Sequence, residues 1–112
     1  MTSFGEITFK GASGREYGFK SFPLNTEFKE FGGVYLITWR HPVSAGIRAG
    51  QTAIFVGRTD NMSVVLNNHS KMECFNQHKA NCVCIHHEDE KNKRKITEMD
   101  LIVALNPPCN TE

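Results

Sequence analysis

Short apolar runs bounded by turn-forming residues occupy the first half of the chain, and two stretches with a helical period follow in the second half. The run at 33–39 is apolar on both faces, because Val34 and Leu36 point one way along an extended chain and Tyr35 and Ile37 point the other. A strand that is covered on both sides gives this pattern. We therefore predict that residues 33–39 form the central strand of a sheet.

A second run, at 53–57, is rich in β-branched and aromatic residues and is the predicted partner of the central strand. Pro42 and Gly50 lie between the two runs, which predicts a hairpin with a long loop. Nearer the N-terminus, residues 7–10 and 17–20 alternate apolar and polar side chains on either side of a glycine-containing turn. That pattern predicts a small additional β-hairpin.

The second half of the chain predicts helices and one further strand. Residues 61–71 begin with a suitable N-cap and carry one apolar stripe at helical spacing, so they are expected to form a helix, with a short helical turn in 72–80. Residues 81–86 are a third strand candidate. A second helix is predicted over 89–105, and the Asn-Pro-Pro sequence at 106–108 should end it.

The predicted fold class is α+β, with a small three-stranded antiparallel sheet flanked by helices. The additional hairpin, within residues 1–30, is expected to decorate a core formed by residues 31–112. At 112 residues the chain has the length of a single domain.

Composition adds several exclusions. The net charge of +1 gives no bulk signal for nucleic acid, although cancelling charges can still be segregated into a local basic surface. No apolar run approaches ~20 residues, so no membrane span is expected. The N-terminus lacks the basic and apolar regions of a signal peptide, which predicts a cytoplasmic protein. In that compartment the four cysteines should be reduced thiols.

Glu98 is the first candidate for chemistry. On the predicted second helix it shares a face with Leu101, Ile102 and Leu105, one turn above an apolar stripe. One interpretation is an i, i+4 ion pair with Arg94 on the helix surface, worth a few tenths of a kcal/mol. The other is a partly buried carboxylate that binds a divalent cation through oxygen.

The cysteines and histidines raise the question of zinc. Cys74 precedes His78 by four residues, Cys82 and Cys84 alternate along a predicted strand, and Cys109 lies near the C-terminus. Structural zinc sites draw their ligands in pairs with two to four residues between them. Because cysteine also behaves as a small buried hydrophobe, buried core cysteines are the favoured interpretation and a structural zinc module is the alternative.

The chain resembles the GIY-YIG endonuclease superfamily. The resemblance rests on Gly33-Val34-Tyr35, then Phe55-Val56-Gly57, then a helix, then Glu98, and finally the ending Asn106-Pro107-Pro108-Cys109-Asn110. It covers residues 33–110 and leaves the N-terminal hairpin outside the family core. The hairpin resembles an embellishment found in a group of small bacterial members of that superfamily. The resemblance implies that family's compact three-stranded sheet with flanking helices.

The resemblance also implies roles for individual residues. Tyr35 matches the first motif tyrosine, which positions or activates the attacking water, and Glu98 matches the metal-binding glutamate. Asn110 matches a late asparagine that supports the active site. His69 falls where some members keep a histidine or tyrosine, and Arg58 lies where some have a basic residue after the second motif.

Two positions depart from the family pattern. The second motif tyrosine is Phe55, which keeps the ring and loses the hydroxyl group, and the motif arginine of the helix falls on Val65. A planar, permanently charged guanidinium suits the charge that develops on a phosphoryl group during cleavage. The two departures therefore predict that any activity is weakened or lost.

The first functional hypothesis is a divalent-metal-dependent phosphodiesterase that acts on nucleic acid, with DNA as the expected substrate. Glu98 would hold one Mg²⁺ or Mn²⁺ ion, which would act as Lewis acid and template. Tyr35 would activate water. Arg58, Arg48 or His69 would replace the missing arginine.

The alternative hypothesis is a non-catalytic domain on the same scaffold that binds nucleic acid or another protein. Basic side chains near the predicted site would contact phosphates, and binding would fall steeply with salt. These side chains are Arg40, His41, Arg48, Arg58 and Lys71.

Overall fold

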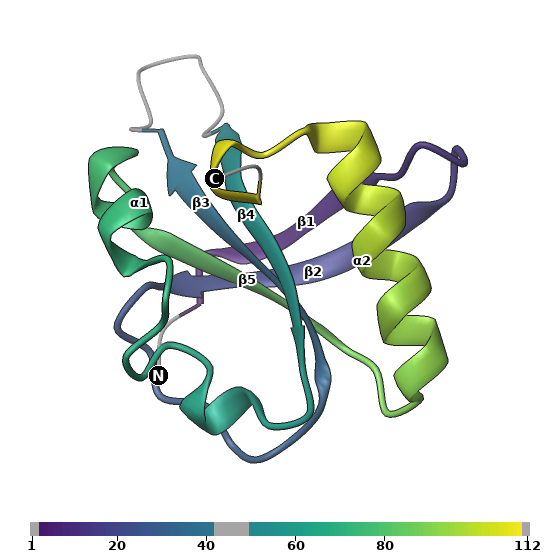
Figure 1. The fold of residues 1–112 in the computed structure, drawn as a ribbon, viewed down its shortest axis with the longest axis horizontal. Helices are drawn as coiled ribbons and strands as arrows, with labels where there is room; N and C mark the ends of the chain where they lie inside the picture. The colour runs from purple at the N-terminus through teal and green to yellow at the C-terminus, as the bar shows by residue number, and fades with distance from the viewer. Residues whose placement is uncertain (1–2, 42–49, 111–112) are drawn as a thin grey trace.

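A computed structural model describes residues 3–41 and 50–110. Its centre is a five-stranded antiparallel sheet with the strand order β1-β2-β5-β3-β4 (Figure 1). The strands are β1 Gly5–Lys10, β2 Glu16–Pro23, β3 Gly33–Arg40, β4 Gln51–Thr59 and β5 Cys82–His87. The helices are α1 Met72–Gln77 and α2 Lys91–Leu105, with short 3₁₀ turns η1 Met62–Val64 and η2 Pro108–Asn110. The α+β class and all five predicted strands are confirmed.

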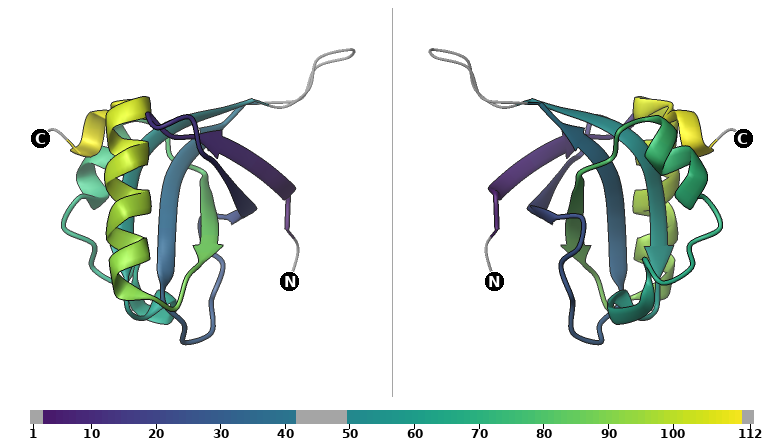
Figure 2. Two further views of the ribbon diagram at one scale, coloured as in Figure 1. Left: turned by 90° about the vertical axis from the view of Figure 1, so that its right-hand side faces the viewer. Right: turned by 90° about the vertical axis from the view of Figure 1, so that its left-hand side faces the viewer.

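The predicted three-stranded sheet with a separate hairpin is wrong. Strand β2 pairs with β5 from Lys20 opposite Ile85 to Pro23 opposite Cys82, so the hairpin continues the central sheet. The sequence could not show this pairing, because β2 and β5 lie about sixty residues apart and no turn connects them. Figure 2 shows β1 and β2 leaning away from β3 and β4, as the twist of an antiparallel sheet requires.

The two faces of the sheet carry two apolar cores, as the pattern in β3 predicts. Val34 and Leu36 pack on one face and Tyr35 and Ile37 on the other. We call the first the α2-side core: Phe9, Tyr17, Phe19, Val34, Leu36, Val56, Cys82, Cys84 and Leu101. We call the second the α1-side core: Tyr35, Ile37, Ile54, Met62, Cys74, Phe75, Val83, Ile85 and Cys109. Strand β3 is buried from Gly33 to Thr38 because both cores cover it.

A β-bulge interrupts the pairing of β3 with β4. Ile37 lies opposite Phe55 and Thr38 lies opposite Ala53, so Ile54 is the extra residue. As a result, Ile54 and Phe55 both face the α1-side core although they are adjacent in sequence. Phe55 lies on the same face as Tyr35, and the centroids of their rings are 6.0 Å apart.

The helix predicted over 61–71 is wrong. Asn61, the first residue of this segment, is the expected N-cap, and its side chain accepts a hydrogen bond from the Ser63 amide. The helical conformation ends after the single turn η1, and Asn68 takes the left-handed conformation with φ of 50°. Two asparagines, a histidine and a serine in 67–70 are weak helix formers, and asparagine tolerates the left-handed region. The apolar stripe still packs inward, because Met62 is buried and Val65 and Leu66 are half-buried.

Helix α2 is confirmed close to its predicted limits and ends at Asn106, whose φ is 44°. The predicted surface pair between Arg94 and Glu98 is not what the structure contains. The Arg94 guanidinium is buried against Gly32, hydrogen bonds the backbone oxygens of Glu88 and Asp89, and pairs with Asp60. Arg94 therefore joins the start of α2 to the segments that follow β4 and precede β3.

The expectation of four reduced cysteines is wrong for two of them. Cys74 of α1 and Cys109 of η2 form a disulfide, and Cys82 and Cys84 are free and buried. The bonded cysteines are 35 residues apart, so only the packing of the C-terminal segment against α1 brings them together. In the parts of the chain that the structure describes, no helix is long and apolar enough to cross a membrane.

Candidate functional site

Four of the predicted site residues gather around the edge strand β4 as two linked pairs. On the α1 side, the Tyr35 hydroxyl lies 2.9 Å from Nε2 of His69. On the α2 side, Arg58 forms an ion pair with Glu98. The negative charge of Glu98 contributes to raising the pKa of Tyr35, which couples the two pairs electrostatically. The resemblance therefore selected residues from four separate segments that the fold brings near one another.

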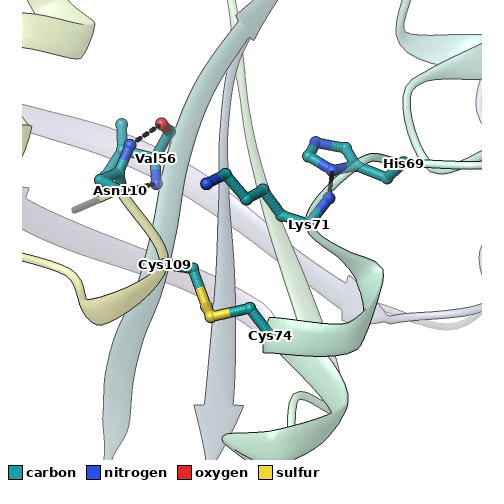
Figure 3. Close-up of a disulfide and its surroundings, with 6 residues drawn as sticks. All are labelled: Val56, His69, Lys71, Cys74, Cys109 and Asn110. Carbon is teal, nitrogen blue, oxygen red and sulfur yellow. Dashed lines mark hydrogen bonds between the residues drawn. A yellow bond between two sulfur atoms is a disulfide. The ribbon is translucent and has the colours of Figure 1, made fainter. Parts of the chain in front are cut away.

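The backbone fixes the tautomer of His69. The amide of Lys71 donates a hydrogen bond to Nδ1 of His69 at 3.0 Å (Figure 3). A backbone amide can only donate, so Nδ1 must be unprotonated and the neutral ring carries its proton on Nε2. That Nε2–H group then donates to the Tyr35 oxygen. Burial lowers the pKa of His69, and the charge of Lys71 lowers it further. His69 is therefore held as a neutral hydrogen-bond donor.

Tyr35 keeps its own proton at neutral pH. Burial is the main cause of its raised pKa, and the Glu98 charge adds to it. Since the Tyr35 oxygen already accepts from His69, its hydroxyl proton is available to a different acceptor. The arrangement suits a group that donates a hydrogen bond and positions a ligand better than it suits a tyrosinate base.

Gly57 makes room for the Tyr35 ring. A Cβ atom at position 57 would lie 2.5 Å from Cζ and from the hydroxyl oxygen of Tyr35 and 2.8 Å from Phe55. Phe55 and Phe75 line the same pocket of rings, with centroids 5.2 Å and 4.8 Å from the His69 ring. The Phe55 ring thus packs where a motif tyrosine is expected, but it brings no hydroxyl group.

Glu98 is the one predicted metal ligand, and the donor set around it can be tested. Its side chain is 15% exposed and that of Arg58 is 44% exposed, so the ion pair borders solvent. Mg²⁺ is commonly held by one or two carboxylates together with waters and substrate phosphates. A single glutamate therefore fits such an ion only when a phosphate group shares the coordination. Without substrate, the Glu98 carboxylate is paired with the Arg58 guanidinium.

The other predicted residues lie apart from the two pairs or outside the described chain. Arg40 lies five residues beyond Tyr35 along β3, about 17 Å away, and its guanidinium stacks 4.3 Å from the Phe4 ring centroid. The Asn110 side-chain amide forms two hydrogen bonds with the backbone of Val56. Its oxygen accepts from the Val56 amide at 2.8 Å, and its nitrogen donates to the Val56 carbonyl at 2.9 Å. It therefore acts as a short extra partner for the edge strand. Arg48 lies outside the described residues.

Sequence reasoning missed the parts of this region that depend on tertiary packing. The Lys71 amide fixes the tautomer of His69, but in the sequence Lys71 is only a residue of a loop. Phe75 contributes a ring to the site, but in the sequence it is only an apolar residue. Within residues 3–41 and 50–110, one group of three metal-ligating side chains lies close together, and it consists of Cys74, His78 and Cys109. These residues were among those considered for zinc, but their grouping depends on the C-terminal segment.

Comparisons with protein-family models, with curated proteins and with solved structures found no match to this chain. The similarity to the GIY-YIG superfamily therefore rests on the sequence motifs and their spacing.

Proposed function

We propose that this protein is a GIY-YIG-like phosphodiesterase that acts on nucleic acid, with Tyr35, Arg58, His69 and Glu98 as its active-site residues. The observation that carries the proposal is that the Tyr35–His69 and Arg58–Glu98 pairs lie on the two faces of the edge strand β4 at adjacent positions, since Tyr35 lies opposite Gly57 and Arg58 follows directly. Each comes from a different segment of the chain: Tyr35 from β3, Arg58 from β4, His69 from the loop before α1, and Glu98 from α2.

The Arg58–Glu98 ion pair supports the proposal through its charge balance. The Arg58 cation can pair with the phosphodiester anion of the substrate, and the Glu98 anion can pair with a divalent cation. When substrate enters, Arg58 turns to a phosphoryl oxygen, which would leave the Glu98 carboxylate to hold the metal ion. The Arg58 side chain is 44% exposed, so its guanidinium is partly solvated and can leave the Glu98 carboxylate when another cation takes its place.

The remaining residues orient the substrate. The Tyr35 hydroxyl group donates a hydrogen bond to the phosphate or to the attacking water, and His69 holds the Tyr35 oxygen in place. A bound Mg²⁺ or Mn²⁺ would supply Lewis-acid stabilisation of the developing charge. Arg58 supplies the positive charge of the motif arginine, whose position is occupied by Val65, and it does so from the opposite side of β4.

The test is a nicking assay on supercoiled plasmid DNA with Mg²⁺ or Mn²⁺. We expect slow nicking by the wild type, none with a chelator and none with Glu98→Ala. Arg58→Ala should lower the rate about 10²–10³-fold, as expected for the loss of one electrostatic donor. Arg15→Ala is the matched control, because Arg15 is an exposed arginine of the β1–β2 turn and belongs to neither of the two pairs. Nicking that survives Glu98→Ala unchanged would refute the proposal.

A second function, nucleic-acid binding without cleavage, is favoured by one specific observation. Glu98 is already neutralised by Arg58, and the position expected to carry the catalytic arginine is an apolar Val65. A binding protein needs only the cations. Fluorescence anisotropy on labelled DNA separates the two: binding with no cleavage, together with a salt slope about one unit smaller in Arg58→Ala, identifies this second function.

A further inference from the structure

The disulfide between Cys74 and Cys109 has a third potential metal ligand beside it. The ligand atoms of Cys74, His78 and Cys109 all lie within 4.8 Å of one another. Cys74 and His78 are four residues apart at the end of α1, and the His78 amide hydrogen bonds the Cys74 carbonyl, so their side chains share one face of the helical turn. Cys109 reaches Cys74 from η2 (Figure 3).

We propose that reduction of this disulfide creates a binding site for one soft divalent metal ion of the zinc type, with Cys74, His78 and Cys109 as ligands. Two thiolates and one imidazole are the ligands that zinc prefers. In a tetrahedral zinc site the two sulfur atoms are about 3.8 Å apart, given zinc–sulfur bonds of about 2.3 Å. Reduction breaks the bond between the two sulfurs and frees them to move apart to that distance, and the ligand atom of the His78 ring already lies within 4.8 Å of both.

The environment suits a metal that can enter and leave. Both cysteines are buried, whereas His78 is exposed, so the cluster lies at the edge of the α1-side core with one side open to solvent. A hollow of about 300 Å³ beside the cluster is lined by Ser70, Lys71, Glu73, Cys74 and Gln77. A small reductant or a hydrated ion can approach through it. The fourth coordination position would be taken by water.

The chemistry balances with ordinary partners. A dithiol gives two electrons and two protons to the Cys74–Cys109 bond and itself becomes a disulfide. Metal binding then releases the two thiol protons to solvent, which makes the affinity rise with pH. In reverse, a peroxide oxidises the two thiolates to the disulfide, takes up two protons to form two waters, and expels the ion. The metal thus replaces the covalent link between α1 and the C-terminal segment whenever that link is reduced.

The experiment measures metal binding directly. The whole protein is reduced with a phosphine, stripped with a chelator and desalted without oxygen. It is then titrated with Zn²⁺ against a coloured competing chelator, and with Co²⁺ to record thiolate charge-transfer and tetrahedral bands. We expect one ion per reduced chain, none per oxidised chain, and release of the ion by peroxide.

Variants assign the ligands. His78→Ala should weaken Zn²⁺ binding by more than the roughly 10–100-fold that loss of an outer partner costs. His78→Cys should restore tight binding with stronger charge-transfer absorption. His87→Ala, which removes another exposed histidine, should change neither. A reduced chain that takes up no Zn²⁺ overturns the proposal, as does unchanged binding in both His78→Ala and Cys109→Ser.

Discussion

At the scale of single residues, the backbone decides what the candidate site can do. His69 cannot easily become an imidazolium, because the proton on Nδ1 would face the amide hydrogen of Lys71. Tyr35 cannot easily become a tyrosinate, because burial and the Glu98 charge both oppose the anion. The pair therefore offers one hydroxyl donor in a fixed direction. The pair positions a ligand, and in the proposed reaction charge stabilisation would come from Arg58 and a metal ion.

The lowered pKa of His69 predicts a pH-dependent stability. At pH values between the His69 pKa of the folded chain and that of the unfolded chain, about 6.5, the unfolded chain binds more protons than the folded chain. The free energy of unfolding should therefore fall as the pH drops through this interval. Urea unfolding at about pH 7.5 and about pH 5.5 should show a larger loss for the wild type than for His69→Gln. An NMR titration of the His69 ring with its midpoint above the unfolded value would contradict this expectation.

Gly57→Ala tests the packing that holds Tyr35 against His69. The new methyl group would overlap the Tyr35 and Phe55 rings, so we expect a loss of about 1–3 kcal/mol in the free energy of unfolding. Gly18→Ala is the matched control, because a Cβ at that strand position meets nothing within 4 Å. It should be neutral or stabilise by up to about 1 kcal/mol. Equal effects of the two substitutions, measured by urea unfolding, would show that Gly57 has no special packing role.

At the scale of elements, local patterns predicted strands well and the connections between them poorly. The strands were predictable because alternation is set by the backbone of each segment alone. The segment 61–71 was not, because a stripe at 62, 65 and 66 packs inward equally well from a single 3₁₀ turn followed by a loop. For the site, motif spacing found Tyr35 and Glu98, but sequence proximity suggested the wrong partner for Glu98. Arg94 lies one helical turn away, yet its guanidinium serves the loop carbonyls.

The disulfide is the strongest link between two elements that otherwise share few contacts. It closes a loop of 35 residues, and the entropy of such a loop corresponds to about 4 kcal/mol of stabilisation. We expect a reductant to lower the free energy of unfolding by about that amount in metal-free solution, measured by urea unfolding. Cys74→Ala should be less stable without reductant and insensitive to it. A wild type that unfolds at the same urea concentration in both conditions would contradict the pairing.

At the scale of the whole molecule, the N-terminal hairpin is part of the structure that supports the site. Phe9, Tyr17 and Phe19 belong to the α2-side core together with Leu101 of α2. The hydroxyl of Tyr17 also donates to Asp100 of α2 at 2.8 Å. The hairpin therefore helps to hold the helix that carries Glu98. A chain that lacked it would expose the edge of β5 and one face of the sheet.

Phe19→Ala should for this reason destabilise the entire protein, including elements that Phe19 does not touch. The ring is 2% exposed, so its removal should cost about 3–5 kcal/mol. Phe4→Ala, which removes a ring that is 40% exposed from the same end of the chain, should cost about 1 kcal/mol or less. Hydrogen exchange distinguishes a cooperative fold from a core with a decoration. If the hairpin is integral, the amides of β3 and β4 lose protection in Phe19→Ala to the same extent as those of β1 and β2. If only the β1 and β2 amides exchange faster, the hairpin unfolds by itself, and the sheet that carries Tyr35 does not depend on it.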